Sequence, residues 1–386
     1  MNFRTGTSMA PLILPTDKPF IEKSKSYKVN DIVAFRKGGR LLAHRIIYRF
    51  PDGSVVTKGD NNVKSDGVIS KSEILGKIEK VLRNGQPISL SHVYLSQSST
   101  YLTELTLLNK ALKKTEVDYV LLKGLPIHLV YSGKIPKRLY FDADILVKRN
   151  NLPLILEIFR KLGYETIEPL LLGKSVGNYS QISFVKKVKP YAVMVDVHFA
   201  PAIGFTKALG FNKLIPSVQA YSRDIFKNAQ EVKVGNGRFP ILLKEDLLLH
   251  LLLHLFHHNF QGIHRMELIK DVIKKDKPDM NIVLNKANKY GYGYFIYPSV
   301  LIINKFFGGI NLPEETRNPL LVLFARFYVL RQSPFDANTK TAEAGKKLVF
   351  TFLLSPLPLL KRLAVVLSKD ALGHFFSTIK SAFFRP

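Results

Sequence analysis

The 386-residue sequence contains no cysteine and no tryptophan, and acidic residues are scarce beside basic ones. The absence of cysteine excludes disulfides and thiolate metal sites, which fits a reducing compartment. With 57 Lys and Arg against 30 Asp and Glu, the formal net charge is +27. Such a charge attracts polyanions, so nucleic acid, anionic lipid and phosphorylated substrates all stay open as partners.

Long hydrophobic runs are missing as well. The longest apolar run, residues 348–360, is shorter than the ~20 residues that a spanning helix needs, and Pro356 and Pro358 interrupt it. No apolar stretch follows Arg4, so the pattern of a signal peptide is lacking. We therefore expect a cytoplasmic protein without a transmembrane helix.

Two regions of different texture follow one another along the chain. Residues 1–95 contain short Val-, Ile- and Phe-rich runs separated by Gly, Asn and Asp turns, which predicts an all-β domain. Later runs have helical periodicity with strand-like segments between them. They predict an α/β core over 98–215, a helical region over 216–340 and a basic tail over 341–386. The polar stretch 83–99 is expected to hold the domain boundary.

The first region carries residues suited to nucleophilic catalysis. Ser8 lies in the small-residue turn TSMAP, and a serine becomes a nucleophile only when a neighbouring base takes its proton. His44 is the candidate base, because it interrupts an alternating apolar strand. Asp60 and Asp66, in the turn KGDNNVKSD, could hold the imidazole in one tautomer. The alternative is a plain turn serine with a satisfied strand histidine.

Together GTSMAP, VNDIVAF, AHRII and TKGDNNVKSD resemble the signal peptidases of the endoplasmic-reticulum and archaeal type, over about the first 85 residues. The resemblance implies a serine endopeptidase with Ser8 as nucleophile, His44 as general base and Asp66 as the orienting acid. Asp60 would support this site, which needs no cofactor and takes a peptide or protein substrate. Asn30 stands where that family has Gly, and the family's membrane helix is missing before Ser8.

Three aspartates in strand-like segments indicate a metal site. Asp142 and Asp144 in FDADILV point to one face of a strand, and two like charges so close are most simply kept for a divalent cation such as Mg²⁺. Asp196 lies within the apolar segment YAVMVDVHF. If the two strands pair, the three carboxylates form a site for phosphoryl or nucleotidyl transfer by two metal ions.

A phosphate site is predicted just before these aspartates. The segment VDYVLLKGLPIHLVY indicates a strand, a Lys-Gly turn and the start of a helix. Gly124 allows close backbone approach, Lys123 supplies a cation, and the amides at a helix N-terminus favour phosphate. Arg138 could hold a triphosphate, so we expect a nucleoside triphosphate as partner.

The motifs LLKGLPIHLVY, RLYFDADILV and VDVHF together resemble the uncharacterised nucleotidyltransferases of the DNA polymerase beta superfamily, over about residues 100–280. The resemblance implies that Asp142 and Asp144 are the metal-binding pair and that Asp196 is the third carboxylate. Lys123 and Gly124 stand where the superfamily places its Gly-Ser phosphate turn, which is a departure from the wider pattern.

Two further patterns lie outside these motifs. His250, His254 and His258 recur every four residues beside a leucine face, where they contact substrate or phosphate or, as an alternative, bind metal. Residues 359–386 combine a Phe and Leu stripe with basic residues, which predicts reversible binding to an anionic surface at the inner face of the membrane. Docking of this helix onto its own protein is the alternative.

Taken together, these patterns predict a multidomain, bifunctional protein. A signal-peptidase-like serine endopeptidase would be fused to a Mg²⁺-dependent nucleotidyltransferase. The alternative is a non-catalytic binding protein that uses both folds to recognise a peptide or a polyanion.

Overall fold

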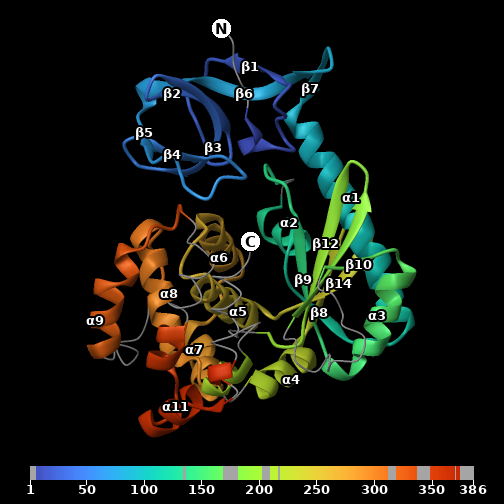
Figure 1. Cartoon of the computed structure of the whole chain (residues 1–386), viewed down its shortest axis with the longest axis vertical. Helices are drawn as coiled ribbons and strands as arrows, with labels where there is room; N and C mark the ends of the chain where they lie inside the picture. Colours follow the sequence, from blue (N-terminus) through green and yellow to red (C-terminus); the bar gives the residue numbers. More distant parts are fainter. Residues whose placement is uncertain are drawn as a thin grey trace.

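The structure is a computed structural model, and it has a β-rich part, an α/β part and a helical part (Figure 1). In Figure 1 the β-rich part lies at the top, the α/β part at the lower right and the helical part at the lower left. The described residues are 6–133, 136–167, 181–201, 209–215, 218–311, 319–336, 348–369 and 371–373. The three parts follow the predicted order of an all-β, an α/β and a mostly helical region.

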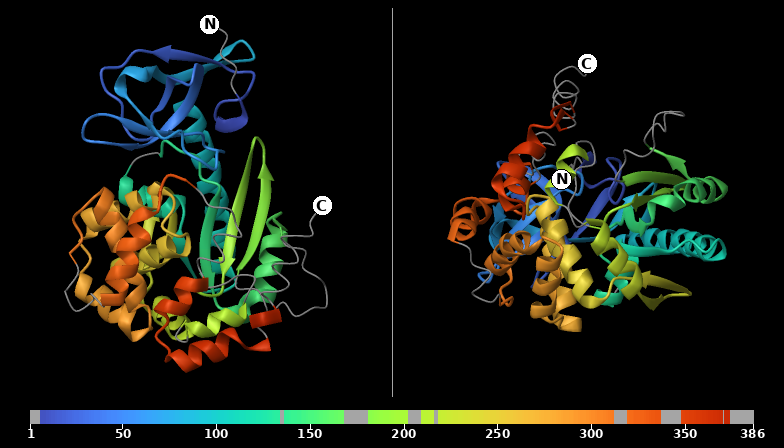
Figure 2. Two further views of the ribbon diagram at one scale, coloured as in Figure 1. Left: turned by 60° about the vertical axis from the view of Figure 1, so that its left-hand side comes forward. Right: turned by 90° about the horizontal axis from the view of Figure 1, so that it is seen from below.

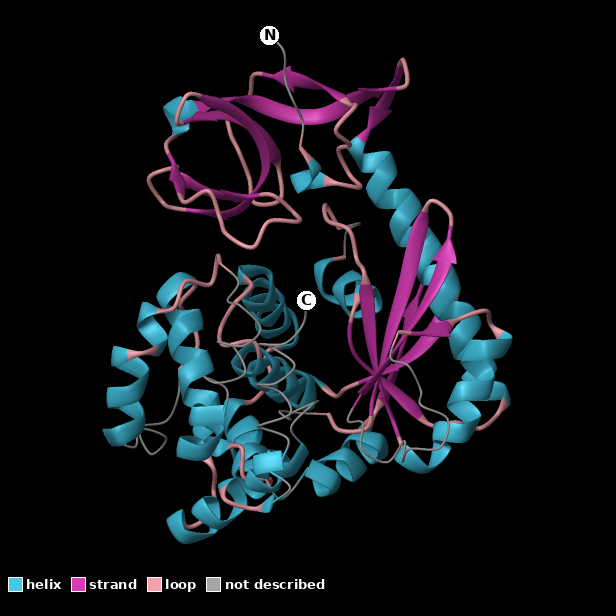
Figure 3. Cartoon of the chain, viewed as in Figure 1, coloured by secondary structure: helices cyan, strands magenta, loops and turns pink. Residues whose placement is uncertain are grey.

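The N-terminal part is a strongly curved antiparallel sheet (Figure 3). Its order is β1-β6-β2-β3-β4-β5, and β7 pairs with β6. Apolar residues fill both faces: Ile32 and Ala34 of β2 belong to one core cluster, while Val33 and Phe35 belong to another. The strands are β1 (Lys18–Glu22), β2 (Ile32–Lys37), β3 (Arg40–Arg49), β4 (Val55–Lys58), β5 (Val68–Ile69), β6 (Ile74–Arg83) and β7 (Gln86–Ser89).

The stretch 83–99, expected to hold the domain boundary, is regular structure in which the β-rich sheet ends and the next helix begins. It contains β7 and the start of α1 (Leu90–Lys114), a single helix that runs from the β-rich part along the α/β part (Figure 2). Part of its polar composition is buried: Gln97 donates to the backbone carbonyl of Tyr140 and accepts from the Tyr140 amide at 3.2 Å, while Ser91, His92 and Ser96 are exposed. Gln97 thus serves a buried hydrogen-bonding contact between helix and loop.

The α/β part is built on a second, mixed sheet of order β10-β11-β12-β9-β8-β14-β13. In its centre β9 runs parallel to β12 and antiparallel to β8, so the carboxylate-bearing strands are direct neighbours. The elements that carry the site are β8 (Tyr119–Lys123), α2 (Leu125–Ser132), β9 (Asp142–Val147), β11 (Gln181–Val188) and β12 (Tyr191–His198). Others are α3 (Leu152–Lys161), β10 (Glu165–Thr166), α4 (Val218–Asn228), β13 (Gln230–Val234) and β14 (Gly237–Ile241).

The first part of the predicted helical region 216–340 is not entirely helical. After α4, the hairpin β13-β14 joins the second sheet beside β8, which corrects the prediction. The turn lies at Gly235 and Asn236 between β-paired segments, and Gly235 has a φ of +57°, a conformation that glycine adopts at little cost. The α/β part therefore extends to residue 241.

The helical part packs against the α/β part around α5. This helix is buried along most of its length and contacts α6, α7 and α8. Figure 1 shows α5 and α6 on the side of the sheet that also carries α2, while α1 and α3 lie on the other side. The helices are α5 (Lys244–His257), α6 (Ile263–Asp276), α7 (Met280–Lys289), α8 (Gly293–Phe306), α9 (Pro319–Phe327) and α11 (Leu359–Val366).

Among the described residues, no helix combines the length and apolar character needed to cross a membrane. Most of the predicted amphipathic stripe, from residue 374 to the C-terminus, lies outside the described residues. Within the described portion, Leu360 and Leu367 are exposed, whereas Ala371 belongs to a small core cluster with Phe211 and Leu214.

Candidate functional site

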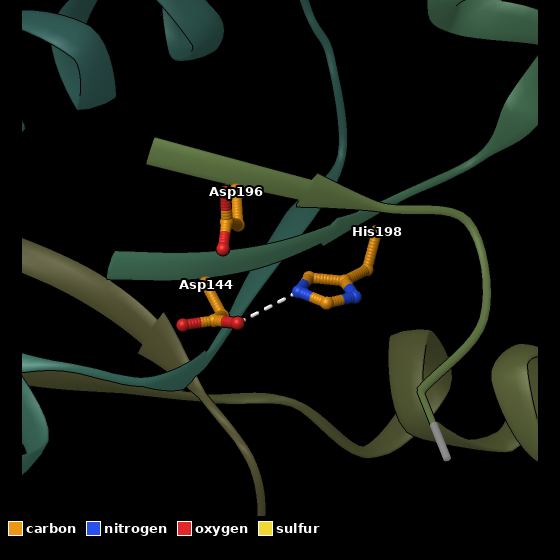
Figure 4. A group of neighbouring side chains, drawn as sticks. All are labelled: Asp144, Asp196 and His198. Atoms are coloured by element: carbon orange, nitrogen blue, oxygen red, sulfur yellow. Dashed lines mark hydrogen bonds and ion pairs between the residues drawn. The ribbon is translucent and has the colours of Figure 1, made fainter. Parts of the chain in front are cut away.

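The most prominent cluster of metal-ligating side chains lies on the two central parallel strands. Asp144 of β9 is paired in register with Asp196 of β12, as the sequence led us to expect for neighbouring strands. His198 follows on the same face of β12 and its Nε2 lies 2.7 Å from Asp144 Oδ1 (Figure 4). Candidate ligand atoms of these three residues all lie within 4.8 Å of one another.

The electrostatics of this cluster fit a bound cation. Burial works to raise the pKa of Asp144, but Lys123 and His198 outweigh burial and hold that pKa well below its usual value. Burial and the charge of Asp144 raise the pKa of Asp196. Asp196 Oδ1 is buried and has no hydrogen-bond partner among the described residues. Two carboxylates and an imidazole are ligand types that suit a divalent metal.

Asp142, predicted as half of the metal-binding pair, lies at the edge of this cluster. Its side chain is 41% exposed, and its Oδ2 lies 3.2 Å from Lys123 Nζ. The same Nζ lies 2.9 Å from Asp144 Oδ2, so one ammonium group bridges both carboxylates. Burial opposes the charge of Lys123, but the two carboxylates outweigh it and raise its pKa. Lys123 therefore acts here as counter-cation to the aspartates.

The Lys-Gly turn has the predicted strand-turn-helix form. Gly124 is the N-cap of α2 and has a φ of +116°. A Cβ on Gly124 would lie 3.2 Å from Ala143 Cα, so the turn packs directly against the strand that carries the aspartates. This close approach aims the start of α2 at the carboxylate cluster.

Arg138 lies in the segment before β9 and lines a pocket between the β-rich part and the edge of the carboxylate cluster. Its guanidinium stacks on the ring of Tyr140, 4.3 Å from the centroid, and its Nε is buried without a hydrogen-bond partner among the described residues. Asp142 lines the same pocket. The predicted nucleotide-binding arginine is thus close to the predicted metal site.

The histidine stripe of α5 runs from the buried His250 to His258, which lines the same pocket as Arg138 and Asp142. His250 is buried, and burial lowers its pKa to about 4, so it is neutral near pH 7. Burial also lowers the pKa of His254 well below its usual value, and its Nε2 lies 3.1 Å from His258 Nε2. Among the described residues, the three do not form a group with metal-binding geometry.

The structure also brings together the predicted serine, histidine and aspartate. Ser8 Oγ lies 3.0 Å from His44 Nε2, and His44 Nδ1 lies 2.8 Å from Asp66 Oδ2. Thr57 Oγ1 donates to the same Asp66 oxygen at 2.8 Å. His44 is buried while Ser8 is half-buried. The arrangement has the hydrogen-bond order of a nucleophile, a base and an orienting acid.

The carboxylate of Asp60, predicted to support the serine site, is bound by Arg45, although the amide of the next residue, Asn61, donates to the Ser8 carbonyl at 2.8 Å. The Asp60 carboxylate accepts hydrogen bonds from Arg45 Nε at 2.7 Å and Arg45 Nη2 at 2.6 Å. Because neighbouring residues of a strand point to opposite faces, His44 and Arg45 serve different surfaces of β3. Arg45 and Asp60 line the interdomain pocket, whereas His44 faces Ser8.

The sequence patterns did not lead us to His198 or to the residues of the β-rich part, such as Arg45, that line the pocket. His198 is two residues after Asp196 in the same strand, so the alternation used for Asp142 and Asp144 could have indicated it. The sequence held no comparable signal for Arg45, because its position depends on how two separate folds meet.

Comparison with known proteins gave one family match. A family model described as an uncharacterised nucleotidyltransferase matches residues 91–308, which include Asp142, Asp144, Asp196 and His198. A solved structure of the antibiotic-resistance factor ANT(2'')-Ia is similar at 13% identity and a TM-score of 0.30, with 46% of this chain and 84% of that chain covered. A search among curated proteins found no match.

Proposed function

The chain belongs to the uncharacterised nucleotidyltransferase family, and from this premise we propose that it transfers a nucleotidyl group with a divalent metal held at Asp144 and Asp196. The acceptor's nucleophilic oxygen or nitrogen would attack the α-phosphorus of a nucleoside triphosphate. The bond from the α-phosphorus to the bridging oxygen of the β-phosphate would break, and pyrophosphate would leave. A bound Mg²⁺ would stabilise the charge that develops on the phosphate oxygens.

The observation that supports this function best is the pairing of Asp144 with Asp196. The two carboxylates are buried side by side on parallel strands, and Asp196 Oδ1 has no hydrogen-bond partner among the described residues. Burying two such groups is costly unless a cation joins them. His198 orients Asp144 through its 2.7 Å hydrogen bond. Asp142 and Lys123 at the open edge are then available to metal and phosphate.

Label position tests the proposal directly. The full chain would be incubated with Mg²⁺, a cell extract as source of acceptors, and nucleotides labelled on either the α- or the γ-phosphate. We expect α-label in the acceptor and γ-label in pyrophosphate, and we expect Asp144→Asn to abolish both. Asp118→Asn is the matched control, because Asp118 is exposed and its ion pair among the described residues is with Lys148. Transfer of γ-label into the acceptor would instead indicate a phosphoryl transferase.

We propose serine endopeptidase activity as a second function, supported by the hydrogen bonds that join Ser8, His44 and Asp66. In this proposal His44 takes the Ser8 proton as Oγ attacks a peptide carbonyl. The residues responsible precede the matched family region, so this proposal does not rest on the family match. A signal-peptidase-like specificity for a peptide or protein substrate would follow from the motifs around Ser8.

A fluorophosphonate probe tests for an activated serine without knowledge of the peptide substrate. We expect one labelled site at Ser8, lost in Ser8→Ala and in His44→Ala. Ser24→Ala is the control, because Ser24 is half-buried and bonds only to nearby Ser26. Labelling that persists in His44→Ala would reject the serine protease. If, in addition, label transfer is absent, the non-catalytic binding protein becomes the better description.

We also retain the proposal that residues 359–386 bind an anionic membrane surface. Its support within the described residues is the exposed set Leu359, Leu360 and Leu367 next to Lys361. Sedimentation with anionic vesicles, comparing the full chain with a truncation after Pro358, tests it. Equal sedimentation of both forms would assign the segment to packing against the protein itself.

A further inference from the structure

A pocket of about 450 Å³ lies where the β-rich part faces the transferase site. One wall comes from β3, β4 and the following turn, including Arg45, Lys58 and Asp60. The other walls come from the segment before β9 and from residues around the start of α6, and Asp142 lies at its edge. The pocket therefore connects the N-terminal part with the carboxylate cluster.

The N-terminal part contributes two cations to this pocket, Arg45, which is paired with Asp60, and Lys58. Lys58 is half-buried at the end of β4, and its Nζ donates to the Phe335 carbonyl at 3.2 Å. Among the described residues it has no ion-pair partner within 4.0 Å. Burial and the nearby charge of Arg265 both lower the pKa of Lys58, while Asp336 partly opposes them. Lys58 and Arg265 are thus two cations held close together in a cavity, and this arrangement favours an anion between them.

Arg138 faces the same pocket from the transferase side. Its segment is fastened to the N-terminal part: Arg45 donates to the Lys137 carbonyl, and Lys137 Nζ lies 3.1 Å from Asp31 Oδ1. Arg138 Nε is buried and has no hydrogen-bond partner among the described residues. The pocket therefore has two cations from each side, Arg45 and Lys58 from the N-terminal part and Arg138 and Arg265 from the other parts.

The acidic residues of the pocket are largely engaged. Asp60 is paired with Arg45, and Asp336 accepts hydrogen bonds from the Ser65 amide at 2.7 Å and the Ser65 hydroxyl at 2.8 Å. Burial raises the pKa of Glu267 to about 7, so that this carboxyl carries only part of its charge near neutrality. Asp142 is paired with Lys123, so Asp336, which stays charged, and the partly charged Glu267 are left to oppose three cations of the pocket, Lys58, Arg138 and Arg265.

We propose that the interdomain pocket binds the phosphate groups of a substrate through Lys58 and Arg138, so that the N-terminal part completes the transferase site. The inference rests on the proposed function in that the bound phosphates would lie beside the metal held at Asp144. A nucleotide's polyphosphate and a phosphorylated acceptor share this chemistry. Lys58 would bind phosphate oxygens through charge-assisted hydrogen bonds, and truncation of the N-terminal part would remove this contribution.

The test is equilibrium binding to the full chain, with and without Mg²⁺. Inorganic tripolyphosphate and nucleoside triphosphates represent the nucleotide's polyphosphate. A phosphate monoester such as ribose 5-phosphate represents the phosphorylated acceptor. We expect Lys58→Met to weaken binding by about tenfold or more, and Lys58→Arg to restore most of it. Lys80→Met is the matched control, because Lys80 is exposed on β6 and does not line the pocket. Thermal unfolding would verify that each variant is folded.

Loss of tripolyphosphate and nucleotide binding in Lys58→Met assigns the pocket to the nucleotide, and loss confined to the monoester assigns it to the acceptor. Equal affinities of Lys58→Met and Lys80→Met for all three probes would overturn the inference, as would failure of every probe to bind the wild type. If Lys58→Met weakens binding while Asp144→Asn leaves label transfer intact, the inference stands and the proposed metal site fails. If Asp144→Asn abolishes label transfer while Lys58→Met leaves binding unchanged, the proposed metal site stands and the inference about the pocket fails.

Discussion

The serine site and the carboxylate site differ in how far their side chains satisfy one another. Ser8, His44 and Asp66 form a continuous series of hydrogen bonds, and Thr57 donates to the aspartate as well. In the carboxylate site, Lys123 pairs with Asp142 and Asp144, His198 pairs with Asp144, and Asp196 Oδ1 has no hydrogen-bond partner among the described residues. The first site is complete with protein groups alone, whereas the second fits an added cation.

This difference also explains how the two sites are positioned. The serine site is assembled within one antiparallel sheet and its preceding turn. His44 and Asp66 are 22 positions apart in the sequence, and Ser8 and His44 are 36 positions apart. The carboxylate site needs parallel pairing of β9 with β12, and its pocket needs two separate folds to meet. Local strand pairing can produce a site from protein groups, but the second site depends on longer-range assembly and on a ligand.

Chelation of divalent metal should separate the two sites most strongly. With EDTA, we expect nucleotidyl transfer to fall by at least about a thousandfold, because electrostatic stabilisation by the metal is lost. Probe labelling of Ser8 should not change, since its base and acid are side chains. Excess Mg²⁺ should restore transfer. Parallel loss of both activities on chelation would show that the sites are not independent.

His198 should have the next largest effect. We expect His198→Gln to lower the transfer rate by about tenfold to a hundredfold, because Asp144 loses the group that orients it. His92→Gln is the control, because His92 is exposed at the start of α1. The two variants would be compared in kcat and in metal dependence. Equal rates would mean that His198 neither orients nor binds anything that the reaction needs.

Removal of Lys123 should strengthen metal binding in the absence of nucleotide. Its ammonium lies 2.9 Å from Asp144 and 3.2 Å from Asp142, so it competes with a cation for the same carboxylates. We expect Lys123→Met to raise Mn²⁺ affinity by about tenfold, measured by titration, and to weaken nucleotide binding. Lys110→Met, an exposed position on α1, is the control. Weaker Mn²⁺ binding in Lys123→Met would contradict the competition.

Glu267 should produce the smallest effect, as a pH dependence of stability. Burial raises its pKa from the usual 4.5 to about 7 in the folded chain. The protonated form is therefore favoured by folding, and its stabilisation, complete below pH 4.5, is lost as the pH rises through about 7. Relative to Glu267→Gln, the wild type should lose thermal stability between these pH values. Parallel stability curves for the two proteins would argue against a buried, protonated Glu267.

Much of this arrangement was accessible from the sequence. Alternation placed Asp142 and Asp144 on one strand, and the Lys-Gly turn was correctly expected between β8 and α2. The hairpin β13-β14 was missed although Gly235 and Asn236 are typical of a tight turn, because the surrounding helical pattern dominated the interpretation. The start of α1 was missed because Gln97 is polar yet buried.

The electrostatic details could not be predicted. Alternation does not say which of two aspartates on one face is buried, and Asp144 rather than Asp142 lies inside the cluster with Asp196. Spacing alone left Asp60 and Asp66 as partners for His44, and the family resemblance selected Asp66, which lies beside His44 while Arg45 binds Asp60. Such choices depend on tertiary contacts between residues far apart in sequence.

Crystals soaked with Mn²⁺ and a non-hydrolysable nucleoside triphosphate analogue test the central claim most directly. Anomalous scattering locates Mn²⁺ without reference to the surrounding protein. We predict a peak within about 2.2 Å of carboxylate oxygens from both Asp144 and Asp196, with Lys123 displaced toward the phosphates and the triphosphate extending to Lys58. An ordered nucleotide whose Mn²⁺ lies away from both aspartates would contradict the account.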